Sequence, residues 1–272
     1  MMKRIRTALC LILAAALLAG CAFLPSESEP EALAPADPLT SHPLEWPGQR
    51  PVAVTIENST ASATQWGISS ASVVLEALTE AGMATELCLV YPALAATPKV
   101  GPVAAGQDIY WRLLVGQQPL PVQRGGGQFD QNYLDYYSIR AVDALEAGRT
   151  AFDCGSEWSN APLWYTSGSA VSKVLDALSI SAVLTESRVT SAASAAAASA
   201  SSGSDAVLTV PALLPQEEDG KLPDATAPDA VNVRVCFDDN NATGFAYDPD
   251  SGLYRMFHAD GTPQLDANNG QQ

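Results

Sequence analysis

The chain has 272 residues, of which 30 are Asp or Glu and 14 are Lys or Arg, so its formal net charge at pH 7 is −16. Such an acidic chain lacks the basic surface with which proteins neutralise phosphates, so a nucleic-acid partner is not expected. Because 47% of the residues are hydrophobic and only 16% are charged, most of the chain is expected to fold around a core.

The N-terminus has the features of a bacterial lipoprotein leader. A short cationic head precedes an apolar run from Ala8 to Ala19, which is too short to span a bilayer because a span takes roughly 20 residues. The run ends in Leu18-Ala19-Gly20-Cys21, which resembles a lipobox, where the cysteine is acylated and the leader is cleaved. We expect residues 1–20 to be a signal peptide and membrane lipid to hold the protein through Cys21, on the extracytoplasmic face of the cell membrane. The alternative is an ordinary secreted protein, or a core helix with a chance cysteine.

The remaining cysteines do not indicate a disulfide framework or a metal site. Outside the leader and Cys21 they number three, and none has CxxC or Cys/His metal spacing, so no metal and no cofactor are expected. Cys88 and Cys236 lie in apolar runs and are expected in the core, whereas Cys154 is the candidate for an exposed thiol.

Two segments have compositions typical of flexible chain. Residues 21–40 are rich in Pro, Glu, Ser and Ala and are predicted to be a disordered tether. Residues 188–230 are first nearly pure Ala and Ser and then acidic and Pro-rich, so they are predicted to be a flexible linker that a protease cuts first.

Between these segments, residues 41–187 show strand and helix patterns in alternation. Such interleaving favours an α/β-like layered domain. A turn at Gly125-Gly126-Gly127 is expected to need unusual backbone angles or a close approach of another segment. Strands are expected at Pro51–Ile56, Thr85–Tyr91 and Ala182–Thr185, and helices from Ser69 or Ser70 to about Gly82, at Asp108–Val115 and at Ser169–Ser179.

Residues 231–272 predict a small β-meander. Alternating or β-rich runs at Val231–Phe237, Gly244–Tyr247 and Leu253–Phe257 are separated by Asn-, Asp- and Gly-rich turns. The whole chain is therefore predicted to be α+β, with an α/β-like N-terminal domain and a small C-terminal β domain.

Five segments occur along the chain in this order: Val54–Asn58, Gly67–Ala71, Glu76–Gly82, Gly101–Val103 and Asp248–Arg255. In their order and spacing they resemble the YerB-like lipoproteins of Gram-positive bacteria, a family with a domain of unknown function. The resemblance covers about Leu39 to Ser187 and Asn232 to Gln271, and it implies an N-terminal α/β domain, a smaller C-terminal domain and no established activity.

The chain departs from the family pattern where that pattern has Arg and His. The family's Arg-small-small-Arg reads here as Ala104–Gln107, its His before paired glycines as Gln123 or Arg124, and its Pro-His-Asn as Pro162-Leu163-Trp164. Its Gly-x-Pro-His-x-Asp reads as Gly261–Asp266. Because Arg binds anions and His moves protons near neutral pH, we expect a divergent member whose polar site is eroded. The family's later strands are also missing, so we expect a C-terminally truncated member.

A few polar residues remain candidates for a site. Glu57 and Asn58 follow a strand, where loops often carry function, and Arg124 beside three glycines could bind an anion, so these three are the candidate binding residues. Glu57, Glu76 and Glu80 could supply the acid and base that glycan hydrolysis needs, and a helix would place Glu76 and Glu80 on one face. The competing interpretations are a loop hydrogen bond for Glu57-Asn58 and a solvated helix face for the glutamates.

Two functions from different classes remain open. The first is a non-catalytic binding or scaffolding role in the cell envelope, with a cell-wall polymer or an envelope protein as partner. The second is a carboxylate-dependent hydrolase of cell-wall glycan or peptide, in either an active or an inactive form. The binding role is favoured because the sequence shows no nucleophile triad, metal constellation or cofactor loop.

Overall fold

The computed structural model describes residues 37–40, 42–59, 65–79, 82–154, 163–184, 212–213 and 230–271. The predicted signal peptide, Cys21, most of the tether, Glu80 and nearly all of the linker lie outside these ranges. Within the described part of the chain, no helix has the length and hydrophobicity that a membrane span requires.

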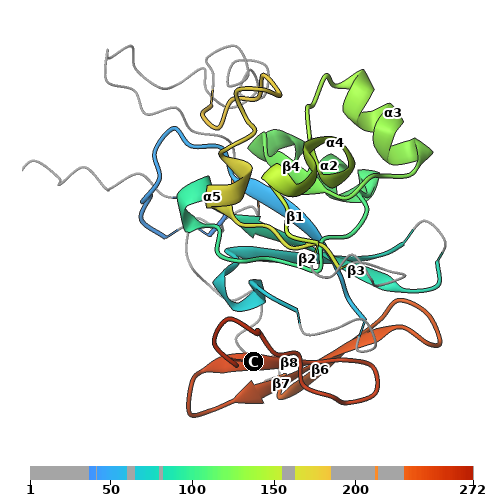
Figure 1. Ribbon diagram of the computed structural model, residues 1–272. Helices are drawn as coiled ribbons and strands as arrows, with labels where there is room; N and C mark the ends of the chain where they lie inside the picture. The colour runs from blue at the N-terminus through green and yellow to red at the C-terminus, as the bar shows by residue number, and fades with distance from the viewer. Residues whose placement is uncertain are drawn as a thin grey trace, which may run out of the picture. The chain divides into compact units, whose positions relative to one another are not determined.

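A five-stranded mixed sheet forms the centre of the N-terminal part (Figure 1). β1 lies in the middle of it, antiparallel to β3 and parallel to β4, so the expected α+β class is confirmed. The strand order is β2-β3-β1-β4-β5, with β1 at Val52–Glu57, β2 at Val73–Leu78, β3 at Thr85–Tyr91, β4 at Leu120–Gln123 and β5 at Val142–Asp143.

Short helices connect and cover the strands. The α-helices are α2 at Asp108–Leu114, α3 at Gln128–Tyr136, α4 at Ala144–Ala147 and α5 at Gly168–Val171. Single 3-10 turns are η2 at Ile68–Ser70, η3 at Leu94–Ala96, η4 at Val115–Gln117 and η5 at Gly148–Thr150.

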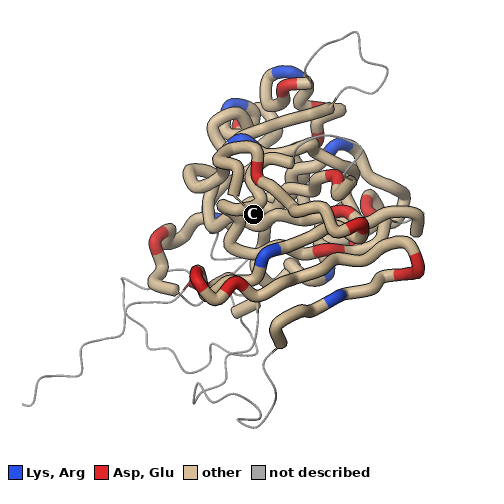
Figure 2. Tube along the Cα trace, turned by 90° about the horizontal axis from the view of Figure 1, so that it is seen from below, with Lys and Arg blue, Asp and Glu red and all other residues tan. Residues whose placement is uncertain are grey.

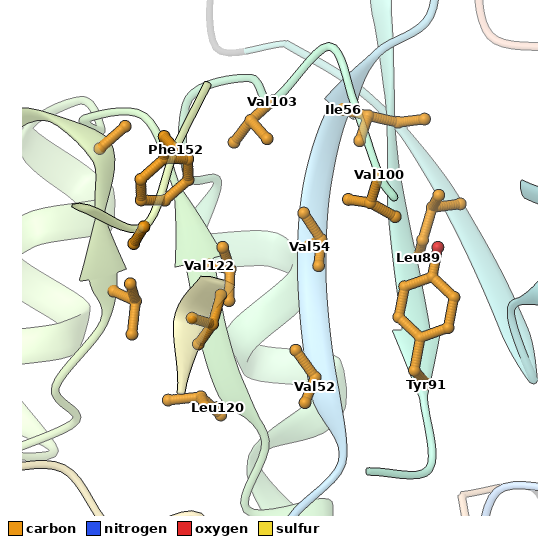
Figure 3. Packing of buried hydrophobic residues seen from close by; sticks show 14 of the residues in the cluster. Val52, Val54, Ile56, Leu89, Tyr91, Val100, Val103, Leu120, Val122 and Phe152 are labelled. Atoms are coloured by element: carbon orange, nitrogen blue, oxygen red, sulfur yellow. The ribbon is translucent and has the colours of Figure 1, made fainter. Parts of the chain in front are cut away.

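Alternation of side chains along the central strands produces a core on each face of the sheet. On one face, Val52, Val54 and Ile56 of β1 pack with β3, β4 and the segment around α5 in the first core (Figure 3). On the other face, Ala53 packs beneath α2 and α3 in the second core, which includes Trp111. Because both faces are covered, β1 and β3 are apolar along most of their length rather than alternating.

The C-terminal part is a three-stranded antiparallel meander of β6 (Asn232–Cys236), β7 (Ala242–Asp248) and β8 (Leu253–Phe257). These bounds lie close to the three strands expected from the sequence. Met256 of β8 packs against the first core, and Ala242 and Thr243 at the start of β7 are buried. The meander therefore shares apolar contacts with the main sheet.

The segment predicted as a helix from Ser69 or Ser70 to Gly82 is a 3-10 turn followed by β2, so this prediction is wrong. The run Val-Val-Leu-Glu-Ala-Leu fits helical spacing, but Val73, Leu75 and Ala77 alternate toward the second core as strand residues do. β2 pairs with β3 along its whole length through a hairpin that turns at Gly82, whose φ is +66°. Pairing with a long buried neighbour outweighs the weak local preference.

Other expectations need smaller corrections. The α-helix α5 ends at Val171 and continues only as turns, and the predicted strand at Ala182–Thr185 is a single bridge between Val183 and Gln49. Cys154 is buried, and Cys236 is exposed because every residue of β6 is exposed. Sequence reasoning also missed α3, α4, β4 and β5.

One point of the predicted linker lies within the described residues and contacts the core. The backbone N–H of Leu213 donates to the carbonyl of Pro38 at 2.8 Å, and its side chain packs against the second core. The sequence predicted this stretch to be flexible linker, but Leu213 attaches it to the start of the domain.

Candidate functional site

Two of the predicted site residues, Asn58 and Glu76, meet where the main sheet contacts the meander. Asn58 Nδ2 donates to Glu76 Oε1 at 2.9 Å and to Thr85 Oγ1 at 2.8 Å. The hydroxyl of Thr243 donates to the Glu76 carboxylate at 2.7 to 2.8 Å. The structure therefore brings Asn58 and Glu76 together, and it uses the Glu76 carboxylate to join β2 to β7.

Glu57 does not join this cluster. It lies directly opposite Glu86 in the register of β1 and β3. Because side chains alternate between the two faces of a strand, Glu57 and Glu86 lie on the same face of the sheet as Ala53, beneath α2. Asn58 reaches Glu76 and Thr85 on the opposite face. Two carboxylates that flank a glycosidic bond must face one another across a few ångströms, so Glu57 and Glu76 are poorly placed as an acid and base pair.

The proposed pairing of Glu76 with Glu80 on one helical face is wrong, because Glu76 belongs to strand β2. In a strand, residues four apart share a face but stand about 13 Å apart along the chain. In a helix the same two residues would lie one turn apart and be close neighbours. Glu80 itself lies outside the described residues.

Arg124 is exposed at the end of β4 and is separated from Glu57 by an inserted backbone segment. The backbone of Ala104 donates to Thr55 and accepts from the N–H of Arg124, so residues 102–104 run between the ends of β1 and β4. In the glycine turn, the N–H of Gly125 is already used by the carboxylate of Asp143, at 2.9 and 3.0 Å. An anion at Arg124 would therefore rely on the guanidinium more than on that amide.

Three of the positions at which the sequence departs from the resembled family, Gly106, Gln107 and Gln123, lie beneath α2 and α3. The amide of Gln107 donates to the Glu86 carboxylate at 2.8 Å, and the amide of Gln123 donates to Asp130 at 2.9 Å. Gly106 lies against Gln123 and Asp130, with no room for a side chain. Neutral amides thus satisfy internal carboxylates where the family pattern has cations.

Asp130 is fully buried in this group, in the first turn of α3. Its Oδ1 accepts from Trp111 Nε1 at 2.5 Å, and its Oδ2 accepts from Gln123 and, at 3.3 Å, from Gln131. Gly126 approaches the carboxylate so closely that a Cβ there would overlap it. The glycine turn is needed for this close approach, as the sequence predicted.

A second contact between the meander and the main sheet was missed from the sequence. The carboxylate of Asp266 accepts from the backbone N–H groups of Gly67 and Ser69, both at 3.0 Å, and from the Ser69 hydroxyl at 2.7 Å. The signal that could have found it is the matched motif Gly261–Asp266, which ends in this Asp. Asp266 joins residues about 200 positions apart in the chain.

His258 follows β8 and is half-buried near Glu76. Burial lowers the pKa of His258, and the nearby carboxylates of Asp260 and Glu76 oppose that effect without cancelling it. The imidazole is therefore largely neutral near pH 7. No group of three or more His, Cys, Asp or Glu side chains in the described ranges could hold a metal ion.

The Asp266 contact predicts a loss of stability in acid. Burial alone would raise the pKa of Asp266, but hydrogen bonds from Asn268, Gly67 and Ser69 outweigh it and hold the pKa below its usual value. The stabilisation is therefore complete above the unfolded pKa of about 3.9 and is lost as the pH falls below it.

We expect the free energy of unfolding in urea to fall between pH 6 and pH 3 by more in the wild type than in Asp266→Asn. The asparagine variant has no carboxylate to protonate and should be less stable already at pH 6. An equal change in both proteins would show that Asp266 is not a source of the pH dependence.

Comparison with known proteins is consistent with this architecture. The N-terminal domain described as "Protein of unknown function (DUF3048)" matches residues 39–181. The crystal structure of the YerB protein from Bacillus subtilis is similar, with a TM-score of 0.65 and 22% identity, over 87% of this chain and 71% of that chain. A search of curated proteins found no match. The family match and the shared fold confirm the resemblance seen in the sequence: the chain belongs to the DUF3048 family of YerB-like domains of unknown function.

Proposed function

We propose that the protein is held on the extracytoplasmic face of the cell membrane by an acylated Cys21 and binds a component of the cell envelope without catalysing a reaction. The anchor rests on the order of cationic head, short apolar run and lipobox in the first 21 residues. An acidic protein is repelled by anionic lipid and anionic wall polymer, so the acyl chains rather than surface charge must hold it at the membrane (Figure 2).

The observation that carries the non-catalytic role is that the inward-facing carboxylates bond to neutral partners within the protein. Glu76 accepts from Asn58 and Thr243, and Asp266 accepts from Gly67 and Ser69. A catalytic acid or base must instead be free to exchange a proton with substrate. These carboxylates hold two sheets together, which favours a rigid binding domain.

Cys21→Ala is expected to release the protein from the membrane fraction, or to leave it with an uncleaved leader that migrates more slowly. The acylated thiol is the only proposed source of firm membrane attachment, and Ala cannot be acylated. The measurement is fractionation of cells followed by gel mobility. Cys10→Ala, which changes the leader's apolar run but leaves the lipobox, is the matched control and should behave as the wild type. Unchanged fractionation and mobility in Cys21→Ala would refute the anchor.

Incubating the protein with purified wall fragments of known size distinguishes the hydrolase alternative from the binding role. Fragments retained at their original length support binding, whereas shortened fragments indicate hydrolysis. Turnover that disappears in Glu57→Ala would show that the protein belongs to the enzyme class. Of the three candidate contacts, Arg124 is exposed and Glu57 and Asn58 are half-buried, so Arg124→Ala is the variant expected to weaken retention with least effect on the fold.

A further inference from the structure

The outer sides of α2, η4 and α3 carry a group of exposed apolar side chains, which we call the helical face. Leu113 is 54% exposed, Phe129 65% and Tyr136 81%. Isolated exposed apolar residues are ordinary, but a group of neighbours marks a surface that contacts a partner or a membrane. The members of the helical face are Ile109, Leu113, Val115, Phe129, Tyr136 and Tyr137.

The helical face is continuous because α2 and α3 touch through Arg112 and Tyr133. The guanidinium of Arg112 lies 4.9 Å from the centroid of the Tyr133 ring. Residues three or four apart share one side of a helix. Arg112 therefore lies beside Ile109 on α2, and Tyr133 lies between Phe129 and Tyr136 on α3. The apolar residues of the two helices thus form one surface rather than two separate patches.

The apolar surface continues into a cavity of about 630 Å³ at the end of α2. Val115 and Tyr137 of the helical face both line this cavity, and no Asp or Glu does. The other apolar residues around it are Trp111, Pro119, Pro121 and Ile139. Apolar groups therefore extend from the helix surfaces into the wall of the domain.

The charge of the helical face is balanced, although the chain as a whole has a net charge of −16. In α2 and η4 the charged residues are Asp108 and Arg112, which pair with each other at 2.7 Å. In α3, Asp130 is buried, and Asp135 lines a separate polar hollow together with Arg140. An anionic bilayer would therefore not repel the helical face.

The meander and its acidic residues lie on the other side of the main sheet. Met256 of β8 packs against the first core, whereas α2 and α3 cover the second core, on the opposite face of the sheet. Exposed carboxylates of the meander are those of Asp238, Asp239, Asp250 and Asp260. When the helical face is turned toward anionic lipid, these carboxylates point away from it, so repulsion favours this orientation.

The chain enters the domain on the side of α2 and α3. Leu39 packs in the second core with Trp111 and Leu114 of α2. The segment from the proposed acylation site, Cys21, to Asp37 spans at most about 55 Å even when fully extended. An anchor at Cys21 therefore keeps this side of the domain within reach of the bilayer.

We infer that the helical face docks on the extracytoplasmic surface of the lipid bilayer, with Leu113, Phe129 and Tyr136 in the headgroup region. The inference rests on the proposed function, because the anchor at Cys21 confines the domain to the membrane. Apolar side chains of an interfacial helix insert about 5 to 10 Å. Tyr rings are enriched at this depth, because their apolar body meets the acyl chains while their hydroxyl stays among polar headgroups.

A bilayer fits the helical face better than a protein partner does. Protein interfaces carry about one hydrogen bond per 100 to 200 Å². The two charged groups of α2 already pair with each other, so the helical face offers mainly the hydroxyls of Tyr136 and Tyr137 as polar groups. Docking on lipid would leave the meander facing the cell wall, where the proposed ligand lies.

The test uses the mature acylated protein in vesicles of equal parts phosphatidylcholine and phosphatidylglycerol. A Cys236→Ser background removes the exposed thiol, since Cys88 and Cys154 are buried. Tyr136→Cys then provides a site for a polarity-sensitive fluorophore, and Leu253→Cys on the meander, where Leu253 is 67% exposed, provides the reference. We expect emission at residue 136 to be about threefold or more that at residue 253. Lipids with a nitroxide near the headgroup should quench the fluorophore at residue 136 and not at residue 253.

Replacing Leu113 and Phe129 together by serine should return the emission at residue 136 to the level of the reference. The matched control replaces Val231 and Leu253 by serine, which removes two exposed apolar residues of the meander and should leave the emission at residue 136 unchanged. Unfolding curves establish that each variant is folded. If the Leu113→Ser/Phe129→Ser variant does not fold, the pattern of nitroxide quenching in the background protein decides the question.

Three results would overturn the inference. The first is equal emission and equal nitroxide quenching at residues 136 and 253. The second is unchanged emission at residue 136 in a folded Leu113→Ser/Phe129→Ser variant. The third is shielding of residue 136 that increases with the ratio of protein to lipid and is insensitive to the nitroxide lipids, which would show that a second copy covers the helical face.

Failure here is distinct from failure of the proposed function. If Cys21→Ala is released from the membrane and wall fragments are retained while residue 136 stays exposed to water, the proposed function stands and docking on lipid is wrong. If Cys21 is not acylated, the anchor is wrong. The same two labels, read after the protein is added to these vesicles, then still show whether the helical face binds lipid.

Discussion

Replacing Gly168 by alanine is expected to lower the free energy of unfolding by about 3 kcal/mol or more, because the added methyl group has no space. Gly168 is the first residue of α5, and its Cβ would overlap the backbone carbonyl oxygen of Leu94 and press on Thr97. The N–H of Gly168 also donates to the Thr97 carbonyl at 3.1 Å, which fixes the two segments together. The obstacle is backbone, so a change of rotamer cannot relieve it.

Gly244→Ala in β7 is the matched control for this prediction. A Cβ at Gly244 would make an ordinary contact of 3.7 Å with Phe257, and the backbone there has no positive φ. Urea unfolding of both variants, followed by circular dichroism, measures the difference. Equal stabilities would mean that the α5 segment moves away from η3 at little cost. That result would also show that the packing of α5 on the first core is loose.

The parts of the fold that sequence predicted well are those in which local pattern and tertiary surroundings agree. Thr85–Tyr91 is rich in apolar and aromatic residues, and it became β3, the strand buried between β1 and β2. The meander was also predictable, because Asn-, Asp- and Gly-rich turns separate its strands and each strand pairs only with its neighbours in sequence. Such local pairing requires no knowledge of distant segments.

β2 shows where local pattern is insufficient. The spacing of Val73, Val74, Ala77 and Leu78 satisfies a helix, and the sequence around it has no property that excludes one. The strand forms because β3 offers a complete row of partners. A sequence pattern cannot show which neighbour is available, so the error reached the candidate site, where Glu76 and Glu80 had been placed on one helical face.

The candidate site was predictable in part for the same reason. The sequence identified Glu57 and Asn58 as polar residues after a strand and placed Glu76 on a helix, and the structure places all three near one end of the sheet. Alternation along β1 then separates Glu57 from Asn58, because neighbours in a strand point to opposite faces. Glu76 also bonds to Thr243 and Ser69 bonds to Asp266, and each of these partners lies more than 160 positions away. Long-range pairs of this kind follow from the packing of the meander and not from local sequence.

Asp130→Ala is expected to cost about 3 kcal/mol or more, because it removes a buried acceptor and leaves its donors unsatisfied. Trp111 Nε1 and Gln123 Nε2 both donate to the carboxylate in a region closed to water. A buried donor without a partner costs about 1 to 3 kcal/mol, and at least two would be left. The lost side chain also leaves a cavity against Gly126. Asp135→Ala, an exposed change on the same helix α3, should alter stability by less than about 0.5 kcal/mol.

A double-mutant cycle with Trp111→Phe separates the hydrogen bond from the general effect of removing a carboxylate. Trp111→Phe keeps an aromatic ring in the second core but removes the N–H that Asp130 accepts. In the Asp130→Ala background that N–H is unsatisfied, so deleting it should cost less than it does in the wild type. The measurement is the free energy of unfolding of the four proteins in urea. Strictly additive losses would mean that the Trp111 bond contributes little, and that Asp130 acts mainly by filling space beside the glycine turn.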